Sequence, residues 1–216
     1  MKRTHIAAFA FALIAASSAD AQTPAQIFET QLSATTLDAA TLAQVAPFVP
    51  PGSFGIDPNV DMLAVLANLQ NRELALDQPY LDIDLMHPIR DDLESRFIAL
   101  MGVEDHALYE PTAMAILVVT VALDRSLETA DSASENLASA RGWWNLAANC
   151  FQGSATPLIP PNPQLGYECL NNSILSLIDA ANDQILLAKM LKIADDTIGT
   201  ASADLETLEP LSENEI

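Results

Sequence analysis

The sequence predicts an all-α protein: a helical bundle built on a long, disulfide-tipped antiparallel helical hairpin. Three observations lead to this fold class. Glycine is scarce, with 7 residues in 216, and none of the 13 prolines falls inside the ranges 112–156 or 164–209. Because proline breaks helix interiors, two proline-free stretches rich in alanine and leucine favour long helices. The two cysteines, Cys150 and Cys169, flank the proline-rich segment between these stretches.

Charge and composition limit the class of protein. The chain has 29 acidic and 9 basic residues, a formal charge of -20, and 50% hydrophobic residues. So large an apolar fraction argues against a disordered acidic chain. The acid excess argues against nucleic-acid binding, because phosphate contacts need clustered lysine and arginine. We therefore expect an acidic globular protein with an apolar core and no nucleic-acid partner.

The N-terminus resembles an export signal. Residues 2–3 are basic, residues 6–16 are apolar, and Ala19-Asp20-Ala21 matches a signal peptidase site. We expect residues 1–21 to be a cleaved signal peptide of bacterial type, which predicts a periplasmic or secreted protein. The best candidate for a membrane span elsewhere, 113–123, is too short to cross a bilayer, so the sequence does not predict an integral membrane protein.

Residues 22–56 are predicted to form an N-terminal helical segment followed by a proline-rich linker. Apolar residues recur every three to five positions over 24–45, and the serine and threonine cluster at 33–36 is expected to divide this stretch into two short helices. The bundle domain is predicted to span 57–209. Its first helix starts with Asp57 as the N-cap and Pro58 at the first helical position.

The first part of the bundle domain is predicted to contain two helices and an extended segment. The first helix runs from Pro58 to about Leu76. Over 79–88, which is bounded by prolines, leucine and isoleucine alternate with aspartate. This period of two predicts an extended conformation, with a second helix following from Ile89 to Met101.

The first long stretch, 111–151, carries apolar residues at spacings of three, four and seven, with Ser134 and Arg141 interrupting them. These apolar residues are Leu123, Leu127, Ala130, Leu137, Trp144 and Phe151. A capping-box pattern at 132–135 indicates that the helix could divide near residue 131.

The second long stretch, 168–198, has a similar apolar pattern that Gln184 interrupts. Its members are Leu170, Ile174, Leu177, Ala181, Ala188 and Leu191. Residues 210–216, which include Glu213 and Glu215, are predicted to be a frayed acidic tail.

Export predicts that Cys150 and Cys169 form a structural disulfide, since secreted proteins meet an oxidising environment. The two cysteines are too far apart in sequence for a CxxC redox motif and too few for a structural zinc site. The bridge would fasten the tip of the antiparallel hairpin.

Two groups of residues are candidate binding sites. In the segment predicted to be extended, Asp82 and Asp84 would point to one side, and with His87 they could bind a divalent cation. The alternative is a solvated strand face.

The second group lies at the hairpin tip, where aromatic residues accompany the proline-rich segment 156–164. Its members are Trp143, Trp144, Pro160, Pro161 and Tyr167. Tryptophan and tyrosine are enriched at interfaces, and a polyproline II segment is a common protein ligand. Adjacent tryptophans on a helix lie about 100° apart, so one could pack inward while the other meets a partner. The alternative is a small core that pins the loop.

The sequence contains no GxSxG, P-loop, GxGxxG, HExxH or CxxCH motif. We therefore expect a non-catalytic protein-interaction or scaffold module that needs no cofactor and binds a protein partner. The alternative function is binding of a small molecule or divalent cation, with or without enzymatic activity, in the region of Asp82, Asp84 and His87.

Overall fold

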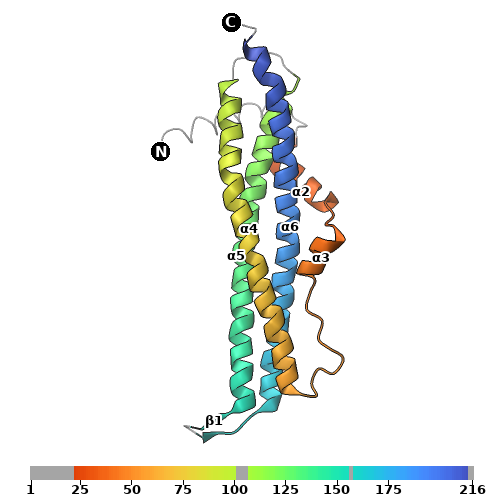
Figure 1. Cartoon of the computed structure of the whole chain (residues 1–216), viewed down its shortest axis with the longest axis vertical. Coiled ribbons are helices and arrows are strands. Elements are labelled where there is room, and N and C mark those ends of the chain that lie inside the picture. The colour runs from red at the N-terminus through yellow and green to blue at the C-terminus, as the bar shows by residue number, and fades with distance from the viewer. Residues whose placement is uncertain (1–21, 101–106, 156–157, 214–216) are drawn as a thin grey trace. The chain divides into compact units, whose positions relative to one another are not determined.

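A computed structural model describes residues 22–100, 107–155 and 158–213. It confirms the all-α class, because five helices account for nearly all of these residues (Figure 1). Their bounds are Pro24–Ala34 for α2, Ala39–Val45 for α3, Pro58–Ala99 for α4, Tyr109–Gln152 for α5 and Pro163–Glu213 for α6. The predicted signal peptide lies outside the described residues. None of the described helices combines the length and apolarity needed to cross a bilayer.

The described residues divide into two compact units. The first contains 22–36, 82–100, 107–126 and 189–213, and the second contains 37–81, 127–155 and 158–188. Within each unit, segments of α4, α5 and α6 lie side by side (Figure 1).

The short N-terminal helices follow from local capping. Thr23 and Gln26 form a capping box at the start of α2, with Pro24 at the first position. The Asp38 side chain accepts a hydrogen bond from the Thr41 amide at the start of α3. Residues 35–38 separate the two helices, as the serine and threonine cluster predicts.

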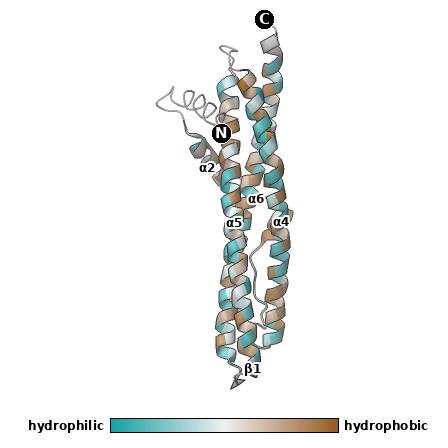
Figure 2. Ribbon diagram, turned by 90° about the vertical axis from the view of Figure 1, so that its left-hand side faces the viewer, coloured by the Kyte–Doolittle hydropathy of each residue, from teal (hydrophilic) through white to brown (hydrophobic). Residues whose placement is uncertain are grey.

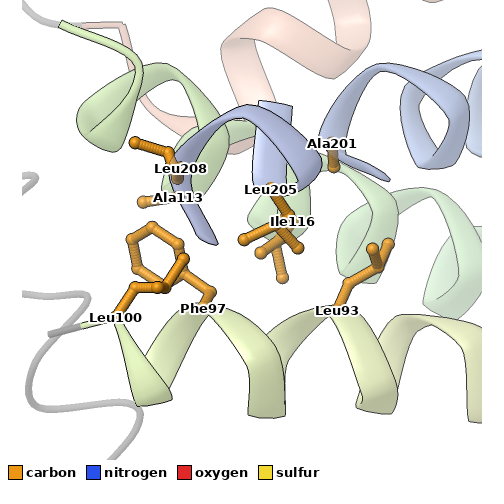
Figure 3. Packing of buried hydrophobic residues seen from close by; sticks show 8 residues of the cluster. All are labelled: Leu93, Phe97, Leu100, Ala113, Ile116, Ala201, Leu205 and Leu208. Carbon is orange, nitrogen blue, oxygen red and sulfur yellow. The ribbon is translucent and has the colours of Figure 1, made fainter. Parts of the chain in front are cut away.

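The core of the first unit is built from large side chains of α4 that meet small and branched ones of α5 and α6. Figure 3 shows Leu93 and Phe97 of α4, and Leu100 directly after its last residue, pointing toward the residues of α5 and α6. The other members are Ala113 and Ile116 on α5, and Ala201, Leu205 and Leu208 on α6. A second cluster in the same unit buries Phe28 of α2 against α5 and α6. Burying large apolar side chains is the main favourable term in folding.

In the second unit, buried positions alternate at spacings of three and four, which is the heptad pattern of packed helices. On α4 they are Met62, Val65, Leu69, Arg72 and Leu76; on α5, Ala130, Ala133, Leu137, Ala140 and Ala147; on α6, Gly166, Leu170, Ser173, Leu177, Ala180, Gln184 and Leu187. We call these positions the seam of each helix. Many seam residues are alanine, serine or glycine, so the backbones can pack closely.

The seam of α5 differs from the prediction. Leu127 is exposed, and the buried neighbours of Ala130 are Ser126 and Ala133. Ser134 and Arg141 therefore lie beside the seam and do not interrupt it. The capping-box pattern left open whether the helix divides near residue 131, and α5 is continuous from Tyr109 to Gln152.

The predicted extended segment at 79–88 is wrong, because α4 is one helix that contains both Pro79 and Pro88. Ile83 is 1% exposed whereas Leu85 is 64% exposed. A strand would place these two side chains on the same face. On a helix, a separation of two residues corresponds to a rotation of about 200°, so the two side chains point in nearly opposite directions. An internal proline costs about 3 kcal/mol, and burial of the α4 seam before and after it offsets this cost.

The predicted disulfide is also wrong, because Cys150 and Cys169 are both free thiols. The prediction rested on the redox compartment and not on geometry. A bridge requires sulfur atoms about 2.05 Å apart with a restricted dihedral angle, and the ends of α5 and α6 do not bring the two sulfur atoms to bonding distance.

Candidate functional site

The candidate site lies where α5 and α6 are joined, in the second unit (Figure 1). After Gln152 the chain turns at Gly153, which has a φ of 67° and donates its amide to the Asn149 carbonyl. A left-handed residue with this hydrogen bond is a common helix end, and glycine adopts it without strain. Two short antiparallel strands, β1 (Ser154–Ala155) and β2 (Leu158–Ile159), follow.

Asn162 starts the return helix. Its side-chain oxygen accepts the Leu165 amide at 3.1 Å, and Pro163 occupies the first helical position. The Asn162 amide donates to the Cys150 carbonyl at 2.8 Å. This bond fastens the start of α6 to the end of α5 without a covalent bridge.

A groove of about 710 Å³ lies against these two helix ends, which is a typical size for a ligand site. Its lining residues are uncharged: Asn149, Cys150, Gly153, Pro160, Pro161, Asn162, Pro163 and Leu165. The predicted interaction residues Pro160 and Pro161 are therefore part of its wall. The proposed polyproline II segment is interrupted by β2 and by the start of α6, and residues 156–157 lie outside the described part of the chain.

Exposed apolar side chains extend along α5 from the groove. Trp143, Leu146 and Cys150 are spaced three and four residues apart, so they lie on one face of the helix. Trp143 and Leu146 are exposed, and Leu165 is exposed at the groove itself. The groove together with Trp143 and Leu146 is called the tip surface below.

Trp144 and Tyr167 pack inward instead of lining this surface. The Trp144 indole N–H donates to the Met62 carbonyl at 2.9 Å, which joins α5 to α4. The Tyr167 ring packs edge-on against Phe151 and Phe54, with centroids 5.0 Å and 6.0 Å away. Of the five predicted interaction residues, the structure thus brings Trp143, Pro160 and Pro161 to the tip surface.

The buried carboxylate of Asp61, in the first turn of α4, was not predicted from the sequence. Its Oδ2 accepts the Gly55 amide at 2.7 Å and the Tyr167 hydroxyl at 3.2 Å. Its Oδ1 is buried without a hydrogen-bond partner among the described residues. A helix N-terminus favours a negative charge, and burial, followed by the bond to Asp61, raises the pKa of Tyr167.

The two thiols differ in environment. Cys150 is half-buried and lines the groove, whereas Cys169 is buried. Burial raises the pKa of the Cys169 thiol, and its interaction with Cys150 raises it further. Since the thiolate is the reactive form, Cys169 is held in its unreactive form at neutral pH.

The helical conformation changes the arrangement of the predicted cation ligands. Asp82 and Asp84 are two residues apart on α4 and so point to opposite sides of the helix, while Asp84 and His87 share a side. Within the described part of the chain, no group of three or more histidine, cysteine, aspartate or glutamate residues could hold a metal ion.

The different roles of the two tryptophans predict different effects of the same conservative change. We expect Trp144→Phe to lower the free energy of unfolding by about 1 kcal/mol, because it removes the hydrogen bond to Met62. Trp143→Phe should change it by less than about 0.5 kcal/mol, since the ring is exposed. Urea unfolding followed by circular dichroism measures both values. Equal losses in the two variants would contradict this assignment.

No family model, no curated protein and no solved structure matches the chain.

Proposed function

We propose that the chain is an exported, non-catalytic protein-interaction module that binds an apolar segment of a partner protein at the tip surface. The observation that carries the proposal is the exposed run of Trp143 and Leu146 leading into an uncharged groove with Leu165 at its edge. Exposed apolar patches of this kind are typical of interaction sites.

The charge distribution supports the proposal. In a chain with a formal charge of -20, none of the described residues that line the groove is acidic or basic. The centres of protein interfaces are depleted of charged residues and enriched in tryptophan. A partner would therefore meet an apolar centre surrounded by an acidic protein surface.

The rigidity of the groove also favours binding. Pro160, Pro161 and Pro163 have fixed φ angles, and the bond between Asn162 and Cys150 holds them against α5. A surface that is ordered before binding loses little conformational entropy when a partner docks. Export remains part of the proposal and is supported by the signal-like residues 1–21.

Site-specific photo-crosslinking tests this function. A photoreactive amino acid at Leu146 should give one discrete crosslinked protein in cells that produce the chain, and Trp143→Ala should reduce its yield at least about tenfold. The matched control is Leu175, which is 59% exposed on α6 and is not part of the tip surface. The proposal fails if position 146 gives no discrete product, or if positions 146 and 175 give the same products.

A further inference from the structure

A second exposed apolar surface lies on α4 and is independent of the tip surface. Hydrophobic residues recur along this helix (brown in Figure 2). Those turned away from the seam of the second unit are Val60, Leu63, Ala67, Leu74 and Leu81, and all five are exposed. We call these five residues the outer stripe. Leu74 is 70% exposed, which is more than Trp143, Leu146 or Leu165 of the tip surface.

The outer stripe has heptad spacing. Val60, Ala67, Leu74 and Leu81 recur every seven residues, so they form one line along the helix. Over the 21 residues from first to last this line is about 32 Å long. A continuous line of this length fits another helix lying alongside, since helices pack through such repeats.

The outer stripe is also nearly free of charge. Between Val60 and Leu81 the exposed residues of α4 outside the stripe are Gln70, Asn71, Asp77 and Gln78. Asp77 is the one acid among these four residues, in a chain that carries 29 acidic residues. The neighbouring Glu73 side chain is 38% exposed and is paired with Arg141 of α5. Two copies with a formal charge of -20 each repel one another, and such a surface lets them approach with the least repulsion.

The order of residues makes the stripe complementary to itself in the antiparallel direction. If two copies of α4 meet with their midpoints between Gln70 and Asn71, Ala67 faces Leu74 of the other copy, and Val60 faces Leu81. Small residues thus oppose large ones, which allows close packing. At the centre of this pairing, the side-chain amides of Gln70 and Asn71 can both donate and accept hydrogen bonds.

The same pairing avoids a charge conflict. Asp77 would face Ala64 in the antiparallel arrangement, whereas a parallel arrangement would place the two Asp77 carboxylates together. We propose that the chain forms a two-fold symmetric dimer in which α4 packs antiparallel against α4 of a second copy through the outer stripe. An interface of this kind uses the same surface on both subunits.

Sedimentation equilibrium of the purified chain tests the dimer. We expect the wild type to be dimeric at micromolar concentration, and we expect dimerisation to strengthen with added salt, because salt screens the repulsion between two acidic chains. Leu74→Glu should raise the dissociation constant at least about 100-fold, because it places a charge in the apolar contact. The matched control Leu175→Glu, on α6, should leave the dimer intact.

A mixing experiment tests the direction of the helices. We expect Ala67→Lys and Leu74→Glu to be monomeric when each is alone, with unchanged helical content by circular dichroism. A 1:1 mixture should form a heterodimer, since the introduced lysine of one copy then faces the introduced glutamate of the other.

Three results would overturn the proposal: a monomeric wild type, a dimer insensitive to Leu74→Glu, or a mixture that stays monomeric. A monomer whose melting temperature falls with Leu74→Glu would instead assign the stripe to a segment of the same chain. Crosslinking of Leu74 to another protein would assign it to a different partner.

Discussion

Replacing Arg72 with alanine is expected to lower the free energy of unfolding by about 3–5 kcal/mol, because it removes a buried cation and leaves its partners unsatisfied. Arg72 is 2% exposed and occupies a seam position of α4. Its guanidinium donates to the Gln184 side chain on α6 at 2.9 Å and to the Asn68 side chain at 2.9 Å. Both partners are neutral.

The remaining bonds of Arg72 reach the end of α3. The guanidinium donates to the carbonyls of Val45 and Ala46, in the last turn and C-cap of that helix. The carbonyl end of a helix carries a partial negative charge, which stabilises a nearby cation. Burial lowers the pKa of the Arg72 guanidinium, but arginine stays protonated in proteins. Arg72 therefore joins α3 to the seam.

This role predicts a local effect as well as a global one. In Arg72→Ala, we expect the amides of α3 to lose their protection from hydrogen exchange under native conditions, since the carbonyls of Val45 and Ala46 no longer have their donor. Arg72→Lys should recover only part of the stability, because an ammonium group cannot match the planar five-donor guanidinium. Urea unfolding measures the global loss of stability, and hydrogen exchange measures the local loss of protection in α3.

Arg96 provides the control on the same helix. Its guanidinium pairs with Glu209 at 2.8 Å in the first unit, where both side chains are partly exposed. Exposed ion pairs contribute about 0–1 kcal/mol, so Arg96→Ala should be nearly neutral. If Arg72→Ala and Arg96→Ala cost the same, or if α3 keeps its protection in Arg72→Ala, the buried hydrogen bonds of Arg72 do not stabilise the second unit.

Features of the fold that depend on neighbouring residues could be predicted from the sequence. Asp57 accepts the Asn59 amide at 2.9 Å next to Pro58, as the N-cap pattern indicates. Two other features also depend on nearby residues. They are the separation of α2 from α3, and the glycine and prolines at the turn between α5 and α6. In each case a side chain satisfies, or a proline removes, a backbone group only a few positions away.

The seam of α5 was harder to predict, because its members carry little hydrophobic signal. Ser126, Ala133 and Ala140 are buried, yet the pattern of large residues leads to the exposed Leu127. The continuity of α4 was difficult to predict for a similar reason, because the local pattern of residues is misleading. Alternation of leucine with aspartate near Ile83 fits a strand, and the packing that overrides it involves residues far away in sequence.

The candidate site was predictable in part. Pro160 and Pro161 line the groove, and Trp143 is exposed on the adjoining face. The inward packing of Tyr167 depends on Asp61, which lies 106 residues earlier. A sequence without aligned relatives gives no sign of such a contact, so Asp61 and Arg72 were missed for the same reason.

The second large effect is expected from Gly166, the first seam residue of α6. A Cβ atom at this position would lie 2.6 Å from Cε1 of Phe151 and 2.8 Å from its Cδ1 and Cζ. The Phe151 ring cannot move away freely, because it packs edge-on against Tyr167. We expect Gly166→Ala to lower the free energy of unfolding by about 2 kcal/mol, since overpacking in a core costs about 1–3 kcal/mol.

Gly142 gives the opposite result for the same substitution. It lies in the interior of α5, and a Cβ atom there would meet nothing within 4 Å. Gly142→Ala should therefore raise the free energy of unfolding by about 0.5–1 kcal/mol, through helix propensity alone. The difference between the two variants isolates the contact with Phe151.

A second substitution tests whether Phe151 causes the loss. In a Phe151→Leu background, the smaller side chain leaves room for the new methyl group, so Gly166→Ala should cost at least about 1 kcal/mol less than in the wild type. If the cost is the same in both backgrounds, the ring contact is not the cause. If Gly166→Ala stabilises the chain as Gly142→Ala does, α5 and α6 do not approach closely at Gly166. The groove next to them would then lack the rigid base on which the proposed binding depends.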